Sequence, residues 1–154
     1  MASVGNVRLS YRPGAAGLLL LLLLLIIISG SVEGIQPITT HRLTAPRQVL
    51  EACLAAILAH NFGELLKEGQ SVLLKLKEAL DASYEIKPDG TAHYRVQFFA
   101  EAFFFQQNVR SPLLSMLTQV TAAYTLRAAG LDPLGNVDGK TLTVEIDYNY
   151  ELNF

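Results

Sequence analysis

Residues 84–107, YEIKPDGTAHYRVQFFAEAFFFQQ, carry the strongest structural signal in this sequence. Pro88, Asp89 and Gly90 are turn-forming residues, and aromatic and β-branched residues lie on both sides of them. This pattern predicts a β-hairpin whose turn lies at these three residues.

The second strand of this hairpin is apolar at both alternating positions. One set holds Phe98, Ala100, Ala102 and Phe104, and the other holds Phe99, Phe103 and Phe105. A strand that is apolar on both faces is normally covered on both. The second set is therefore the candidate binding site, and we expect it to contact the N-terminal helices or something outside this chain. The alternatives are a protein partner, a second copy, an apolar small molecule or ordinary core packing.

The flanking segments show helical spacing before the hairpin and after it. Between residues 49 and 82, apolar residues recur at helical steps, which predicts one helix, a break at residues 61–63 and a second helix ending near Ala82. Over residues 111–130, Ser111 as N-cap, Pro112 in the first turn and Gly130 past the end predict a further helix.

The last segment, residues 141–154, alternates strictly between apolar and polar side chains. This period of two predicts a strand with one dry and one wet face, with Tyr148 buried and Asp147 exposed. The whole pattern predicts an α+β fold, in which a small, mostly antiparallel sheet is formed by the hairpin and the C-terminal strand. N-terminal helices and one central helix are expected to pack on it.

Residues 1–34 have the pattern of a signal peptide or a signal anchor. Arg8 and Arg12 precede the apolar run GLLLLLLLLIII, and Val32 and Gly34 fit cleavage before Ile35. The run is shorter than the ~20 residues that span a bilayer, so cleavage is favoured over a single-pass anchor. Either way, we expect an extended lead-in at 35–48 and one domain at 49–154, on the extracellular or lumenal side of the secretory pathway.

Charge and cysteine content narrow the classes of partner. The chain has net charge −2; residues 1–34 hold two of its 12 basic and one of its 14 acidic residues, which leaves −3 for the rest. This balance argues against a nucleic-acid partner, which requires a basic face. Cys53 is the only cysteine, so no disulfide forms within the chain, and its apolar helical neighbours predict a buried side chain.

Residues 134–145 match part of a calcium-binding loop, with Asn136, Asp138 and Glu145 at the third, fifth and twelfth positions. Leu134 stands where the first acidic ligand is required, so a polar turn is favoured over a metal site. We expect no cofactor, and no nucleophile or phosphate-loop motif is present. The sequence therefore predicts an exported or membrane-anchored, non-enzymatic interaction domain acting through a Phe-rich apolar surface. The alternatives are a carrier with an internal cavity for a lipid or other apolar small molecule, and an enzyme without a recognisable motif.

Overall fold

The computed structural model describes Gly14 and residues 38–148, within which residues from Ile38 onward belong to one compact unit. The elements in chain order are β1 (Thr40–Arg42), α2 (Pro46–Leu65), β2 (Ser71–Ile86), β3 (Ala92–Phe105), β4 (Leu114–Leu126) and β5 (Val137–Asp147). The predicted signal segment lies outside the described residues. In the part of the chain that the structure describes, no helix combines the length and the apolar character needed to cross a bilayer.

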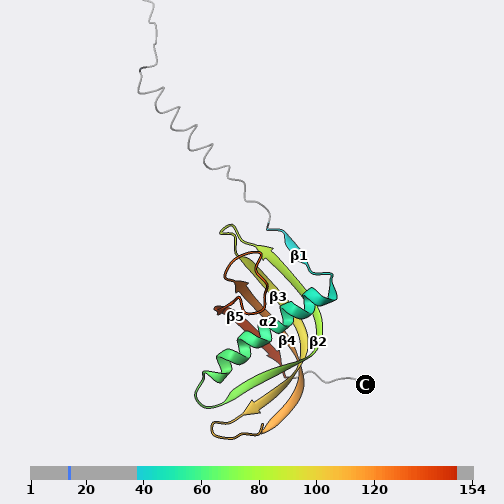
Figure 1. Cartoon of the computed structure of the whole chain (residues 1–154), viewed down its shortest axis with the longest axis vertical. Helices are drawn as coiled ribbons and strands as arrows, with labels where there is room; N and C mark the ends of the chain where they lie inside the picture. The colour runs from blue at the N-terminus through green and yellow to red at the C-terminus, as the bar shows by residue number, and fades with distance from the viewer. Residues whose placement is uncertain (1–13, 15–37, 149–154) are drawn as a thin grey trace, which may run out of the picture. The chain divides into compact units, whose positions relative to one another are not determined.

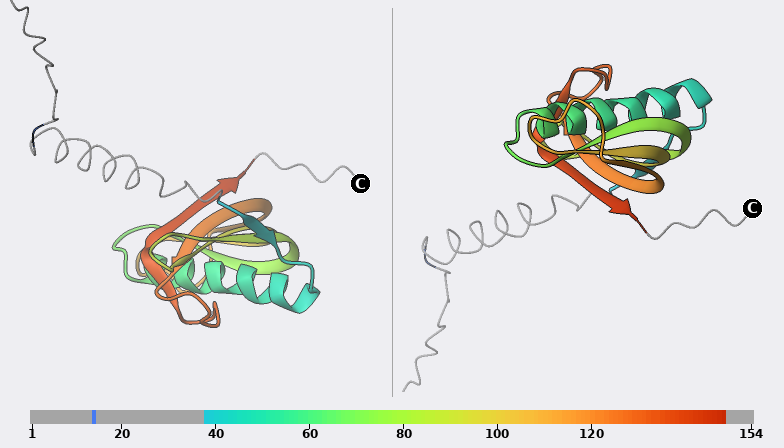
Figure 2. Two further views of the ribbon diagram at one scale, coloured as in Figure 1. Left: turned by 90° about the horizontal axis from the view of Figure 1, so that it is seen from above. Right: turned by 90° about the horizontal axis from the view of Figure 1, so that it is seen from below.

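The five strands form one antiparallel sheet in which each strand pairs with its neighbour in sequence, in the order β1-β2-β3-β4-β5. Helix α2 lies across one face of this sheet (Figures 1 and 2). The predicted α+β class with an antiparallel sheet is confirmed. Of the predicted helices, the first N-terminal one is present as α2, whereas the second N-terminal helix and the central helix are wrong, because α2 is the one helix among residues 38–148.

The hairpin predicted at Pro88–Asp89–Gly90 is confirmed and joins β2 to β3. The Lys87 amide donates to the Thr91 carbonyl at 2.8 Å, and Gly90 has a φ of 81°, which glycine adopts without steric cost. The Asp89 carboxylate accepts hydrogen bonds from both the amide and the hydroxyl of Thr91.

The predicted second helix, up to Ala82, is strand β2. The pairing of β2 with β3 shifts twice, between Leu76 and Glu78 and between Ala79 and Asp81. Each shift is a β-bulge that adds one residue to the strand. The residues that face the core therefore follow steps of two and three rather than a constant two, and this spacing resembles that of a helix: Leu74, Leu76, Ala79, Ala82 and Tyr84.

The predicted central helix at residues 111–130 is also wrong, because this segment forms β4. Its buried side chains alternate with a period of two: Thr118, Val120, Ala122, Tyr124 and Leu126. Gly130, expected after a helix end, has a φ of 81° in the connection between β4 and β5. The apparent N-cap, first-turn proline and terminal glycine favoured the wrong element, and burial of one face of the strand in the core outweighs these local signals.

Helix α2 begins with Pro46 in its first turn and continues without a break through residues 61–63, where the sequence predicted an interruption. Its small buried side chains, among them Ala52, Cys53 and Ala56, pack on the sheet around Phe98 and Tyr124. Figure 2 shows α2 on one side of the sheet along its whole length. The helix therefore seals one face of the sheet, and no other helix within residues 38–148 covers the opposite face.

Four stacked rings cross the sheet from its edge to its core. The centroid distances are 5.1 Å between His41 and Tyr84, 5.4 Å between Tyr84 and Tyr94, and 5.3 Å between Tyr94 and Tyr124. Tyr124 is fully buried, and its hydroxyl donates to the Ala52 carbonyl of α2 at 3.0 Å. These four rings therefore connect the short strand β1 to the core of the sheet, and the Tyr124 hydroxyl connects the same row of rings to helix α2.

Side chains near the end of α2 form hydrogen bonds with backbone groups on the outer edge of β2, in the part of β2 that β1 does not pair with. The Asn61 amide group accepts from the Leu74 amide at 2.8 Å and donates to the Leu74 carbonyl at 2.9 Å. Glu64 accepts from the Val72 amide at 3.0 Å. These bonds replace a strand partner and block edge-to-edge pairing at these residues.

Strand β5 has the orientation that its alternation predicts. Leu142, Val144 and Ile146 are partly buried against the core, while Thr143, Glu145 and Asp147 are exposed. Tyr148 was predicted to be buried, but it is 47% exposed. The strand ends at Asp147, so the Tyr148 ring lies past the sheet and packs at a tilt on Phe104, with 5.8 Å between centroids.

Candidate binding surfaces

The two apolar sets of β3 point to opposite faces of the sheet. Phe98, Ala100 and Ala102 are fully buried under α2. Phe99, Phe103 and Phe105 lie on the other face and are half-buried. No helix forms at 111–130 to seal one face of β3, because that segment is strand β4, and α2 seals the face instead. The second set was expected to contact the N-terminal helices or something outside the chain. No helix among residues 38–148 covers it, and a partner outside the chain stays a prediction.

The neighbouring strands add further apolar side chains to this uncovered face. Leu73 of β2 is the direct cross-strand partner of Phe103. Leu117 of β4 is the direct partner of Glu101, which lies two residues before Phe103 on the same face of β3. Direct cross-strand partners point to the same face of a sheet. We call these residues the open-face patch: Leu73, Phe99, Phe103, Phe105 and Leu117.

An ion pair lies beside the open-face patch. Lys77 Nζ is 2.8 Å from a carboxylate oxygen of Glu101, and the hydrogen bond from Lys77 is the main cause that lowers the pKa of Glu101 below its usual value. A surface hollow of about 410 Å³ lies next to the pair, and its lining residues are Lys77, Glu101, Ser115, Met116 and Leu117. The patch therefore combines an apolar centre with a charged margin.

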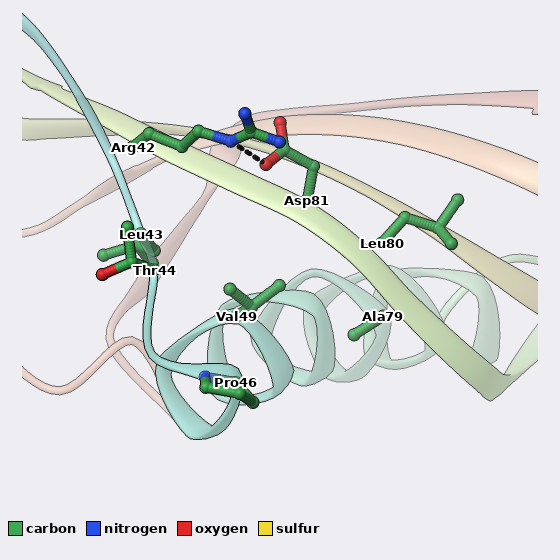
Figure 3. A pocket seen from close by; sticks show the side chains of 8 residues that line it. All are labelled: Arg42, Leu43, Thr44, Pro46, Val49, Ala79, Leu80 and Asp81. Atoms are coloured by element: carbon green, nitrogen blue, oxygen red, sulfur yellow. Dashed lines mark hydrogen bonds and ion pairs between the residues drawn. The ribbon is translucent and has the colours of Figure 1, made fainter.

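A second hollow, of about 460 Å³, lies where β1 leads into α2 (Figure 3). Leu43, Val49, Ala79 and Leu80 supply apolar lining. Arg42 Nε donates to the Asp81 carboxylate at 2.8 Å on one side of it. Leu80 is the extra residue of the second register shift, between Ala79 and Asp81, so this bulge helps to shape the hollow.

The structure does not gather the residues of the partial calcium-loop match. The side chain of Asn136 donates to the Asp132 carbonyl, and Asp138 accepts from the Lys140 amide. Glu145 lies seven residues along β5 from Asp138, about 23 Å in an extended strand. No cluster of three or more His, Cys, Asp or Glu side chains suited to a metal ion occurs among the described residues.

Cys53 is buried, as its sequence neighbours predicted. Burial, together with the charge of Asp81, raises the pKa of its thiol to about 12. The thiol is therefore protonated at neutral pH and lacks the thiolate that nucleophilic chemistry requires.

Sequence reasoning missed two features. The hollow at Arg42 is shaped in part by a bulge in β2, which no local sequence pattern predicted. Residues 35–48, which supply its other side, were expected to be only an extended lead-in. The outer surface of α2 is also apolar, with Leu58, Phe62 and Leu65 exposed. The four-residue spacing of the large apolar residues at 50, 54, 58 and 62 was a signal for the latter.

The chain matches no family model, and neither curated proteins nor solved structures show significant similarity to it. The site must therefore be interpreted from its own geometry.

Proposed function

We propose that this chain is an exported or membrane-anchored binding domain that recognises another protein through the open-face patch. The observation that carries this proposal is the position of Phe103 and Phe105 on the sheet face that α2 does not cover. Aromatic side chains at the centre of a surface, with charged groups at its margin, are typical of protein interfaces.

The dimensions of the patch favour a protein over a small molecule. From Phe99 to Phe105 the strand extends about 20 Å, and Leu73 and Leu117 widen the apolar area onto both neighbouring strands. An apolar surface spread over three strands suits a partner segment or domain that lies across them.

Site-specific photo-crosslinking tests the proposal. A benzophenone amino acid replaces Phe105 in the full chain expressed in an exporting host, and the matched control replaces Gln97, which lies on the same face of β3. We expect a discrete crosslinked protein from position 105 that disappears when Phe103→Ser is added. Equal crosslinking from both positions, or a product insensitive to Phe103→Ser, would reject a specific interface.

The hollow at Arg42 supports a second candidate function, the binding of an apolar small molecule with an acidic group. Its lining combines apolar side chains, which suit an alkyl chain, with the Arg42–Asp81 ion pair (Figure 3). Asp81 accepts from Arg42 Nε, and the guanidinium carries further N–H donors that suit a carboxylate. A medium-chain fatty acid should then raise the melting temperature of the wild type but not of Arg42→Gln. An equal rise in both proteins would remove this candidate.

A further inference from the structure

A further hollow lies where helix α2 meets β5 and the connection between β4 and β5. Its volume is about 390 Å³, which lies within the range of small-molecule pockets. Leu58, Ala59 and Phe62 line it from α2, and Val137 and Gly139 line it from β5. Leu58 and Phe62 are 56% and 67% exposed. A molecule held in this hollow would therefore cover apolar surface that the described part of the chain leaves in contact with water.

A bulge in β5 shapes one wall of this hollow. Between the pairs that Ala123 and Thr125 form with β5, four residues of β5, 139–142, lie opposite a single residue of β4. The Thr141 hydroxyl holds the bulge, because it accepts from the Thr125 amide at 2.9 Å and donates to the Asp138 carbonyl at 2.8 Å. The wall is therefore in place before any ligand binds, which lowers the entropic cost of binding.

Arg127, the first residue after β4, supplies a charge to the hollow that it helps to line. Its side chain is exposed and forms no hydrogen bond or ion pair with the other described residues. Arg42, at the other hollow, is paired with Asp81 instead. A guanidinium without a partner presents its N–H donors in one plane and can bind a carboxylate through two parallel hydrogen bonds.

The charges of this region favour a ligand with a single negative charge. Among the described residues that line the hollow, Arg127 is the one cation. Asp132 and Asp138 lie in the same part of the chain, and their carboxylates accept hydrogen bonds from backbone amides. One positive group with two carboxylates near it in the chain suits a carboxylate better than a doubly charged phosphate.

The Phe62 ring favours an aromatic ligand over an alkyl chain. Two aromatic rings attract each other beyond the area that they bury, in offset or edge-to-face contact, and a guanidinium such as that of Arg127 also stacks on aromatic faces. The apolar lining of the hollow at Arg42 holds no ring and is formed by Leu43, Val49, Ala79 and Leu80. The two hollows therefore suit different ligands.

We propose that the hollow at Arg127 binds a free aromatic carboxylate, whose ring packs on Leu58 and Phe62 and whose carboxylate pairs with Arg127. This inference goes beyond the proposed function, because the hollow lies on the side of the sheet that carries α2 and the open-face patch lies on the other. Either one can fail without the other.

Isothermal titration calorimetry with sodium naphthoate tests the proposal on the full chain, expressed in an exporting host and purified. We expect the wild type to bind one equivalent and Arg127→Gln to bind about tenfold more weakly or less, because hydrogen bonds to a charged group are lost. The matched control is Arg110→Gln, because Arg110 is exposed in the connection between β3 and β4. Its affinity should equal that of the wild type. A wild type that does not bind, or equal affinities of the two variants, would overturn the proposal.

A neutral analogue separates the charge of the ligand from its ring. Naphthylmethanol keeps the ring system but lacks the carboxylate, so it should bind the wild type about tenfold more weakly than naphthoate does. Arg127→Gln should leave its affinity unchanged. If Arg127→Gln weakened both ligands equally, Arg127 would act on the shape of the hollow and not on the carboxylate, and the proposed ion pair would be wrong.

Filling the hollow tests where the ring lies. A Cβ built on Gly139 would meet no atom within 4 Å, and its φ lies outside the left-handed region, so a larger side chain fits there. Gly139→Leu should abolish naphthoate binding with an unchanged far-UV circular dichroism spectrum. Normal binding by this variant would contradict the site.

Photolabelling of the wild type with benzoylbenzoate keeps the proposal falsifiable if Gly139→Leu fails to fold. This probe is itself an aromatic carboxylate, and mass spectrometry locates the residues that it labels. We expect labels in residues 55–62 and 127–139 that excess naphthoate suppresses. Suppressible labelling confined to β3, or to the hollow at Arg42, would overturn the assignment.

Discussion

At the scale of single residues, the hydroxyl of Tyr124 makes a buried hydrogen bond between the sheet and the helix. It donates to the Ala52 carbonyl at 3.0 Å, and burial raises the pKa of the phenol well above its usual range. The group is therefore a donor at every pH at which the protein is handled. The Ala52 carbonyl lies inside α2 and also accepts the helical hydrogen bond, so Tyr124 supplies its second hydrogen bond in a place that water does not reach.

Replacing Tyr124 with Phe should lower the free energy of unfolding by about 1 to 2 kcal/mol, because a buried carbonyl loses a partner while the ring and its stacking stay. Chemical denaturation measures the change. Tyr148→Phe is the control, since that ring is 47% exposed, and its effect should stay within about 0.5 kcal/mol. Equal effects would mean that the Tyr124 hydrogen bond contributes nothing.

The lowered pKa of Glu64 predicts how the stability of the domain depends on pH. Burial favours the neutral acid, but hydrogen bonds from Lys67 and the Val72 amide and the charges of Lys67 and His60 outweigh it, so the pKa of Glu64 lies below its ordinary value of 4.5. A carboxylate with a depressed pKa stabilises the fold above the unfolded value and loses that contribution as the pH falls through the folded value.

Stability should therefore fall as the pH drops below about 4.5, and it should fall less steeply in Glu64→Gln. Urea denaturation from pH 7 down to pH 3 measures both proteins. Parallel curves would show that Glu64 has the same pKa in the folded and unfolded states.

At the scale of elements, substitutions in β4 can distinguish the strand seen in the structure from the helix that the sequence predicted. Ala122 is buried under α2, whereas Ala123 is half-buried on the other face and Leu117 belongs to the open-face patch. In the predicted helix, Leu117 would lie on the apolar face, and its replacement would lower the stability of the domain more than replacement of Ala122 or Ala123.

Ala122→Asp should destabilise the domain by about 3 kcal/mol or more, because it places a charge in the core, and Ala123→Asp by about 1 kcal/mol or less. Thermal melts of both variants and of Leu117→Asp give the ranking. If Leu117→Asp proved the most damaging, the assignment of β4 as a strand would be wrong.

Local chemistry predicted the hairpin and most of β5 because each follows one rule: a Pro-Asp-Gly turn in one case and a period of two over residues 141–147 in the other. The first residues of β5, from Val137, do not alternate and were not predicted as strand. Strands β2 and β4 could not be predicted in this way. The bulges of β2 change its period, and β4 is held by contacts with α2 and with β5, such as the hydrogen bond of 2.5 Å from the Thr118 hydroxyl to the Asp147 carbonyl. The separation of the phenylalanines into two faces was readable from the sequence, but which element covers which face was not.

At the scale of the whole molecule, the sequence of residues 1–34 predicts export of the domain or its anchoring to a membrane. Cleavage before Ile35 should give an exported product that begins at Ile35, which N-terminal sequencing of material from an exporting host detects. Recovery of membrane-bound chains with an intact N-terminus would establish the anchor instead.

The domain as a whole has a sealed face, where Phe98 lies under α2, and an open face with Phe103 and Phe105. The proposed function depends on this asymmetry, because rings needed for folding cannot also be available to a partner. Stability and binding should therefore be separable along a single strand.

The melting temperatures of Phe98→Ser and Phe105→Ser, compared with that of the wild type, test this separation most directly. Phe98→Ser should cost about 3 to 5 kcal/mol or prevent folding, because it leaves a cavity and a hydroxyl in a fully buried site. Phe105→Ser should cost about 1 kcal/mol or less and leave a folded domain. If Phe105→Ser melts as low as Phe98→Ser, the open-face phenylalanines belong to the core, and the proposed binding surface is contradicted.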